Sequence, residues 1–193
     1  MGLTIDKKEV NTLPTETFEG EIIVIDQPEQ VSAAVNHLLE HSKLGFDTET
    51  RPAFRKGQVN KVALMQLSTT DVCYLFRLNK LGYPDELDNI ICNPEIMKIG
   101  LSLRDDFDAI GGRSKRKPQN FVDLQPFVDK YGIEDNSLQK IYAIIFKKKI
   151  AKRQRLSNWE IKTLSPAQKN YAAIDAWACL RIYNYLVDKY GKL

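Results

Sequence analysis

Acidic residues in otherwise apolar segments are the feature that most constrains how this chain folds. Three of the four occupy positions where the apolar pattern predicts core, and the set is Asp47, Glu49, Asp106 and Asp175. A carboxylate that faces a folded interior loses several kcal/mol of hydration unless a cation or strong hydrogen bonds replace the water. The fold must therefore supply a compensating charge, and hard divalent ions are the natural candidates.

The spacing of apolar residues predicts an α/β fold. Strand patterns occupy residues 21–25, 44–49, 61–67, 72–76, 96–100 and 121–122, and helical patterns occupy residues 28–39, 85–91, 104–110 and 166–189. The polar residues 68–71 separate two strands as a hairpin turn would, so these strands are expected to be antiparallel. The later alternation of strand and helix predicts parallel additions. We expect a central mixed β-sheet flanked by helices.

The last helix has the clearest predicted boundaries. Ser165 can cap it, Pro166 suits its first position, Gln168 completes a capping box, and Gly191 follows its last turn. Its apolar stripe consists of Tyr171, Ile174, Ala178, Ile182, Tyr185 and Leu186. Asp175 falls within that stripe, so this aspartate is predicted to point towards the core.

The length of 193 residues predicts one domain, which we place at residues 20–193 with residues 1–19 as a loosely held lead-in. The net charge of +3 permits a polyanionic partner without requiring one. The N-terminus lacks the apolar stretch of a signal peptide, so the default expectation is a cytoplasmic location. The longest apolar run, residues 141–146, is far short of the roughly 20 residues that span a bilayer.

The three cysteines, Cys73, Cys92 and Cys179, lie far apart in the sequence. Their odd number and wide spacing suggest neither a disulfide framework nor a paired zinc site. We expect them to be small buried hydrophobic residues.

Asp47 and Glu49 are predicted to project from one face of a strand, about 7 Å apart, because strand side chains alternate. This spacing is short enough for the two carboxylates to share metal ions. The Asp-x-Glu pattern is also common in unrelated proteins, where a solvated loop is the alternative.

Three motifs together resemble those of the DEDD superfamily of 3′-5′ exonucleases. They are Phe46-Asp47-Thr48-Glu49-Thr50, Gly100-x5-Asp106 and Tyr171-x3-Asp175. The spacing and the segments at 156–159 and 164–168 are similar to ribonuclease D and to the exonuclease domain of the Werner syndrome helicase. The resemblance is to the tyrosine branch, because Asn170 stands where a histidine-branch enzyme places its base. His37 and His41 lie on an early helix and are expected to be surface residues.

The resemblance implies an RNase H-like fold and two-metal hydrolysis of the 3′-terminal phosphodiester. In that scheme Asp47 would bridge two Mg²⁺ or Mn²⁺ ions, Glu49 and Asp175 would complete the site of the attacking water, and Asp106 would support the second ion, through water. Tyr171 would orient that water or help to deprotonate it. The alternative for Tyr171 is a core aromatic residue whose hydroxyl is hydrogen-bonded.

Two further aspartates bear on the assignment. Asp105 is an alternative to Asp106 if the motif is shifted by one residue, although a first-turn helix charge is the simpler interpretation. Asp123 is expected to cap a helix rather than to bind metal.

A basic segment precedes Trp159 and is predicted to bind nucleic acid through backbone phosphates. Its cations are Lys147, Lys148, Lys149, Lys152, Arg153 and Arg155. Trp159 is assigned to the same nucleic-acid-binding group because it could stack on a base, although packing of its ring in the core is the favoured alternative. A second basic rim is proposed at Arg51, Arg55 and Lys56. A solvated charged surface is the alternative for both groups.

The sequence therefore predicts a metal-dependent 3′-5′ exonuclease whose partners are the 3′ ends of nucleic acid, with DNA favoured and RNA allowed. Contacts to the backbone, without base-specific recognition, are expected. Two alternatives remain at this stage: a catalytically idle module that binds nucleic acid or protein, and a phosphodiesterase of short oligonucleotides.

Overall fold

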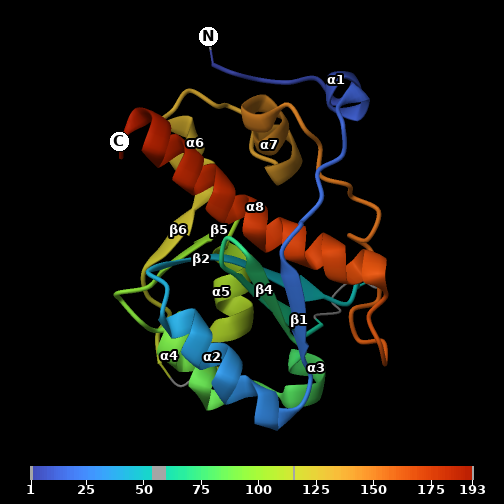
Figure 1. Cartoon of the computed structure of the whole chain (residues 1–193), viewed down its shortest axis with the longest axis vertical. Helices are drawn as coiled ribbons and strands as arrows, with labels where there is room; N and C mark the ends of the chain where they lie inside the picture. Colours follow the sequence, from blue (N-terminus) through green and yellow to red (C-terminus); the bar gives the residue numbers. More distant parts are fainter. Residues whose placement is uncertain (1, 54–59, 115, 193) are drawn as a thin grey trace.

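A six-stranded mixed sheet lies at the centre of the molecule. The computed structural model describes residues 2–53, 60–114 and 116–192 and orders the strands β1-β4-β3-β2-β5-β6 (Figure 1). Their bounds are β1 Glu21–Ile25, β2 Lys43–Thr50, β3 Val62–Ser68, β4 Val72–Phe76, β5 Met97–Gly100 and β6 Phe121–Asp123. Strand β3 is antiparallel to β2 and to β4, whereas the other pairs are parallel. The predicted hairpin and the predicted parallel additions are both confirmed.

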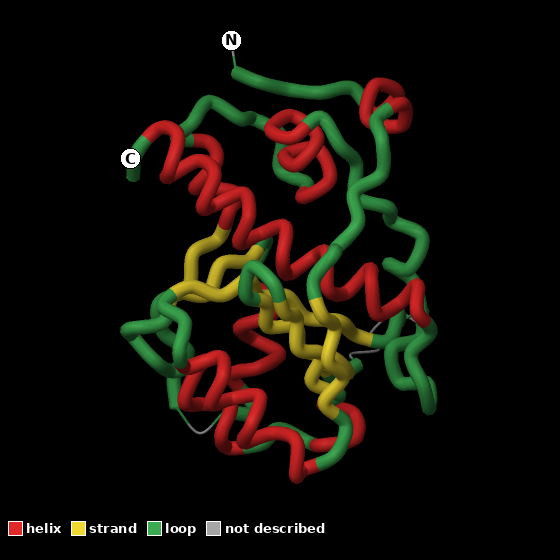
Figure 2. Tube along the Cα trace, in the orientation of Figure 1, coloured by secondary structure: helices red, strands yellow, loops and turns green. Residues whose placement is uncertain are grey.

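Helices cover both faces of this sheet, as Figures 1 and 2 show. The helix α8 crosses one face, and α2, α4 and α5 lie on the other. The helical bounds are α1 Lys7–Thr12, η1 Pro28–Gln30, α2 Val31–Leu39, α3 Leu78–Leu81, η2 Asp85–Leu87, α4 Asp88–Ile91, α5 Arg104–Gly111, α6 Leu124–Asp129, α7 Leu138–Phe146 and α8 Pro166–Tyr190. Two buried apolar clusters fill the spaces between these layers. The predicted α/β class, with a mixed sheet flanked by helices, is confirmed.

The ends of α8 follow from its sequence. The Ser165 hydroxyl accepts a hydrogen bond from the Gln168 backbone N–H, and the Gln168 side chain accepts one from the Ser165 N–H, which completes the capping box. Gly191 follows the last turn with φ of 80°, in the left-handed region that favours glycine. The helix begins at the predicted residue and ends one residue later than predicted.

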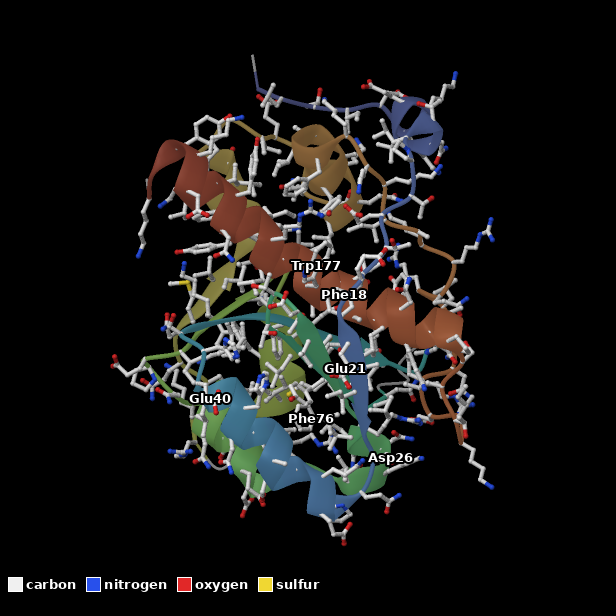
Figure 3. The ribbon with its side chains drawn as sticks, viewed as in Figure 1. Phe18, Glu21, Asp26, Glu40, Phe76 and Trp177 are labelled. Carbon is white, nitrogen blue, oxygen red and sulfur yellow. The ribbon has the colours of Figure 1, made fainter. Side chains whose placement is uncertain are left out.

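The N-terminal segment is tied to the rest of the fold, so the expectation that residues 1–19 are loosely held is wrong. Ile5 and Val10 are buried against Ala143 of α7, and Phe18 packs edge-on against Trp177 of α8 at 5.6 Å between ring centroids (Figure 3). These contacts join residues far apart in the sequence, which is why local patterning did not indicate them. The division of the chain at residue 20 remains a prediction.

A buried ionic contact reinforces this attachment. The Glu16 carboxylate accepts hydrogen bonds from the Tyr142 hydroxyl at 2.7 Å, from Lys148 at 2.9 Å and from Arg181 at 2.8 Å. Glu16 is only 5% exposed, and its charge is compensated by two cations. The segment before β1 is therefore anchored to α7 and α8.

Cys73, Cys92 and Cys179 are buried and form no disulfide, as expected from their spacing. Within the described parts of the chain, no helix combines the length and the apolar character needed to cross a membrane.

Candidate active site

The acidic residues of β2 meet α8 where the helix lies closest to the sheet. A Cβ atom on Gly45 would lie 2.0 Å from the carbonyl oxygen of Ala176, so only glycine permits this approach. Asp47 follows Gly45 by two residues and shares its face of the strand, while Asp175 precedes Ala176 on the helix. The close contact of the two backbones therefore sets the distance between these aspartates.

Three carboxylates converge at this contact. Asp47, Glu49 and Asp175 each present an oxygen within 4.8 Å of the others. Two of them come from alternate positions of β2 and the third from the helix above, as the strand alternation predicted. Carboxylate oxygens at this spacing can be shared by one or two hard divalent cations.

Asp106 lies near this cluster and is hydrogen-bonded to Thr48, the residue between Asp47 and Glu49 on β2. The Thr48 hydroxyl donates a hydrogen bond to the Asp106 carboxylate, so Asp106 is reached from the opposite face of β2. Its charge still acts on the cluster, because it raises the pKa values of Asp47 and Glu49. An outer role through water is compatible with this placement and remains a prediction. The side chain of Asp105 lies outside the described residues, and Asp123 caps α6 as expected.

Burial raises the pKa values of all three carboxylates, and repulsion between them adds to this rise at Asp47 and Glu49. Burial, together with the charges of Asp175 and Asp106, raises the pKa of Glu49 to about 8. Burial likewise raises the pKa of Asp175 to about 7, against the opposing effects of Tyr171 and Lys152. For Asp47, burial and then the charges of Asp175 and Glu49 hold the pKa well above its ordinary value. These oxygen donors fit a divalent cation, which would offset both the burial and the mutual repulsion.

Tyr171 lies one helical turn before Asp175 and faces the same cluster. Its hydroxyl is close enough to Asp175 to oppose part of the rise that burial causes in the pKa of that carboxyl. Burial and the charges of Asp175 and Glu49 raise the pKa of the phenol itself. Tyr171 therefore places a protonated hydroxyl beside Asp175.

A cavity of about 340 Å³ opens beside these residues. Its charged and aromatic lining is Asp47, Lys152, Arg155, Tyr171 and Asp175, and its polar lining is Ser102, Gln125, Asn136, Ser137 and Gln139. Lys152 and Arg155 come from the segment between α7 and α8. Both line the same cavity as the carboxylates of Asp47 and Asp175. This arrangement can accept an anionic group such as a phosphate next to a metal-binding cluster.

The structure divides the predicted basic segment into two parts. Lys152 and Arg155 line the cavity, where Arg155 lowers the pKa of Glu49. Lys148 instead pairs with Glu16, and Lys149 donates to the carbonyl oxygen of Asn11 at 2.6 Å. Lys147 ends α7, and Arg153 lines a different hollow. Contact of any of these residues with nucleic acid remains a prediction.

Trp159 is buried, which corrects its assignment as a nucleic-acid-binding residue. Its side chain is fully shielded at 0% exposure, so neither face of the ring is available to a base. The ring packs 6.1 Å from that of Tyr171, and its indole N–H faces Glu49 closely enough to lower the pKa of that carboxyl without reaching hydrogen-bond geometry. The packing alternative therefore holds.

Other residues around the site were not indicated by the sequence. Buried Arg77 donates to the carbonyl oxygens of Trp159 and Ile161 and so holds the loop that carries Trp159. Thr48, whose hydroxyl bonds to Asp106, is part of the first motif, but nothing in the sequence indicated this contact. Of the second basic rim, Arg51 pairs with Glu160 at 3.4 Å, and Arg55 and Lys56 lie outside the described residues.

The raised pKa values predict how the metal-free protein responds to pH. Glu49 and Asp175 bind protons more tightly in the folded chain than at their ordinary pKa values of 4.5 and 3.8. The folded state therefore holds more protons, and the free energy of unfolding falls as pH rises from about 4 to about 8. Thermal melting in EDTA at several pH values measures this fall. Added Mn²⁺ should reverse it most strongly near pH 8, and a metal-free stability that increases over this range would contradict the assignment.

The mixed sheet with α8 laid across it, and the carboxylates at their contact, define a domain of the RNase H-like class. The family model described as 3′-5′ exonuclease matches residues 22–190. This chain belongs to that 3′-5′ exonuclease family, as the motifs predicted.

Individual relatives agree with this membership. The chain is 29% identical over 186 residues to the bifunctional 3′-5′ exonuclease/ATP-dependent helicase WRN of Mus musculus, covering 91% of this chain and 13% of that protein. It is 32% identical over 155 residues to a 3′-5′ exonuclease of Arabidopsis thaliana, covering 75% of this chain and 52% of that protein. The chain thus spans about half or less of the length of these relatives.

The fold is shared with solved nuclease structures. The catalytic core of RRP6 from Trypanosoma brucei superposes with a TM-score of 0.79 at 19% sequence identity, over 96% of this chain and 54% of that one. At this level of identity the likeness describes the architecture alone.

Proposed function

We propose that this chain is a metal-dependent exonuclease that hydrolyses phosphodiester bonds one after another from the 3′ end of a nucleic acid. The observation that carries the proposal is the cluster of Asp47, Glu49 and Asp175, of which Asp47 and Asp175 line a cavity together with Tyr171, Lys152 and Arg155. Membership of the 3′-5′ exonuclease family supports it.

The residues that would hold two Mg²⁺ or Mn²⁺ ions are the four acidic residues of the motifs. Asp47 would be shared between both ions, Glu49 and Asp175 would complete one site, and Asp106 would support the other through water. When bound, such ions supply an acidified water molecule and stabilise charge on the attacking and leaving oxygens.

The remaining groups act on substrate and water. Lys152 and Arg155 are placed to bind the phosphate and to counter its charge next to the carboxylates. The neutral Tyr171 hydroxyl would fix the direction of the attacking water with respect to phosphorus. Water oxygen bonds to phosphorus as the bond to the 3′ oxygen of the preceding nucleotide breaks, which releases a nucleoside 5′-monophosphate.

The proposed function includes both DNA and RNA as candidate substrates. The likeness to the Werner-type enzyme supports DNA ends. A Trypanosoma brucei RNase D of similar fold, with a TM-score of 0.79 and 21% identity, is known in complex with RNA U12, which supports RNA. Both polymers therefore belong in the test.

The test is a degradation ladder on 5′-labelled DNA and RNA, single-stranded and recessed, with Mg²⁺, Mn²⁺ or EDTA. We expect metal-dependent shortening from the 3′ end by the wild type and none by Asp47→Asn. No cleavage under any condition, with retained binding in a gel-shift assay, would favour the idle module. Cleavage confined to di- and trinucleotides would favour the oligonucleotide phosphodiesterase.

A further inference from the structure

Gln66 lies directly beside the carboxylate cluster on the neighbouring strand. In the antiparallel register of β2 and β3 it stands opposite Asp47, so both side chains project from the face that α8 covers. Directly opposed residues have Cβ atoms about 4.5–5.5 Å apart. The Gln66 amide therefore has the reach to meet the Asp47 carboxylate.

The surroundings of Gln66 on its other side are apolar. Its partner on β4 is Leu75, which is fully buried, and Leu64 occupies the same face of β3 two residues earlier. Both leucines belong to the apolar cluster under α8. An apolar side chain at position 66 would continue this packing, so a polar amide at this position calls for a reason.

The amide of Gln66 is both buried and unpartnered. The residue is 0% exposed, and neither its amide nitrogen nor its amide oxygen has a hydrogen-bond partner. Among the residues that the structure describes, the one other buried side-chain nitrogen or oxygen in this condition is the indole nitrogen of Trp159, which faces Glu49. A buried polar group without a partner destabilises the fold, because it has lost its hydrogen bonds to water. Both unpartnered side chains thus adjoin carboxylates of the first motif.

We propose that Gln66 is a positioning residue for Asp47: its amide N–H donates to the Asp47 carboxylate and fixes the orientation of that carboxylate. The inference rests on the metal site of the proposed function. The amide has no partner in the structure, and this hydrogen bond would form as the Asp47 carboxylate turns to hold a cation. Residues of this outer kind commonly change metal affinity by about 10–100-fold.

The test is Gln66→Met, which keeps the length of the side chain and removes its polar atoms. Two quantities are measured: the Kd for Mn²⁺ by isothermal titration calorimetry, and the melting temperature in EDTA. We expect the Kd to rise at least about 10-fold while the metal-free melting temperature stays equal or increases, because an unpartnered amide is removed. A purely structural role of Gln66 would instead leave the Kd for Mn²⁺ unchanged and lower the metal-free melting temperature.

Ser68→Ala is the matched control, because Ser68 lies on the same face of the same strand and its hydroxyl donates to the Thr69 carbonyl oxygen at 2.8 Å. This variant should melt at a lower temperature and keep the wild-type Kd for Mn²⁺. An unchanged Kd in Gln66→Met, or a lower metal-free melting temperature, overturns the assignment. Wild-type protein that fails to bind Mn²⁺ overturns it together with the metal site. The titration needs no substrate, so a wild type that binds Mn²⁺ without cleaving nucleic acid defeats the proposed exonuclease alone.

Discussion

Asp47→Asn is expected to abolish cleavage and Mn²⁺ binding while making the metal-free protein more stable. The carboxylate of Asp47 is disfavoured by burial and by the charges of Asp175 and Glu49, so a neutral amide of the same shape relieves the metal-free fold. The loss of Mn²⁺ affinity should exceed the 10–100-fold typical of an outer residue, since a shared ligand is removed. Calorimetry with Mn²⁺ and thermal melting in EDTA at pH 8 give the two quantities. For a chain of this size each kcal/mol corresponds to about 2–4 °C.

Asp26→Asn is the control for this substitution. Asp26, which is labelled in Figure 3, directly follows β1 and pairs with Lys80 at 2.6 Å. Its replacement should lower the stability slightly, by about 0–1 kcal/mol as for other surface ion pairs, and leave Mn²⁺ binding unchanged. Equal Mn²⁺ affinity in wild type and Asp47→Asn would remove Asp47 from the site.

Tyr171→Phe is expected to lower kcat about 100-fold, near the lower end of the range for a positioned proton-transfer group, with Mn²⁺ affinity retained. The reason is that in the proposed function the protonated phenol would orient the attacking water, whereas acidification of that water would come from metal binding. Single-turnover rates and Mn²⁺ titration of the same preparation separate the two effects.

Tyr185→Phe provides the comparison on the same helix. The Tyr185 hydroxyl accepts a hydrogen bond from Lys189 at 2.8 Å on the surface, far along α8 from Asp175. This variant should cleave at the wild-type rate. If Tyr171→Phe also cleaved at that rate, Tyr171 would be the core aromatic residue of the alternative interpretation.

The parts of the fold that were predictable have local signals. The α8 boundaries follow from Ser165, Gln168 and Gly191, whose preferences act within a few residues. The sheet follows from runs of apolar residues and one polar turn. The N-terminal segment was misjudged because its stability depends on Glu16 and Phe18 contacting α7 and α8, and such contacts leave no periodic pattern in the sequence.

The site likewise contains residues that local patterns predict and residues whose placement depends on distant contacts. Strand alternation placed Asp47 and Glu49 on one face, and helical spacing placed Tyr171 one turn before Asp175. The partner of Lys148 could not be predicted, because it depends on how the N-terminal segment is folded against distant elements. Gln66 was indistinguishable from other residues of its strand until the register with Asp47 was known.

The contact at Gly45 has a consequence for ion selection. Gly45 carries no ligand atom, yet the clearance it gives to the Ala176 carbonyl determines how far apart Asp47 and Asp175 stand. Mg²⁺ binds oxygen at about 2.0–2.1 Å, whereas Ca²⁺ requires about 2.3–2.6 Å. Discrimination between ions of unequal radius would therefore reside in a position that never touches the ion. Any side chain at position 45 would push α8 away from β2 and so change the spacing of these carboxylates without replacing either of them.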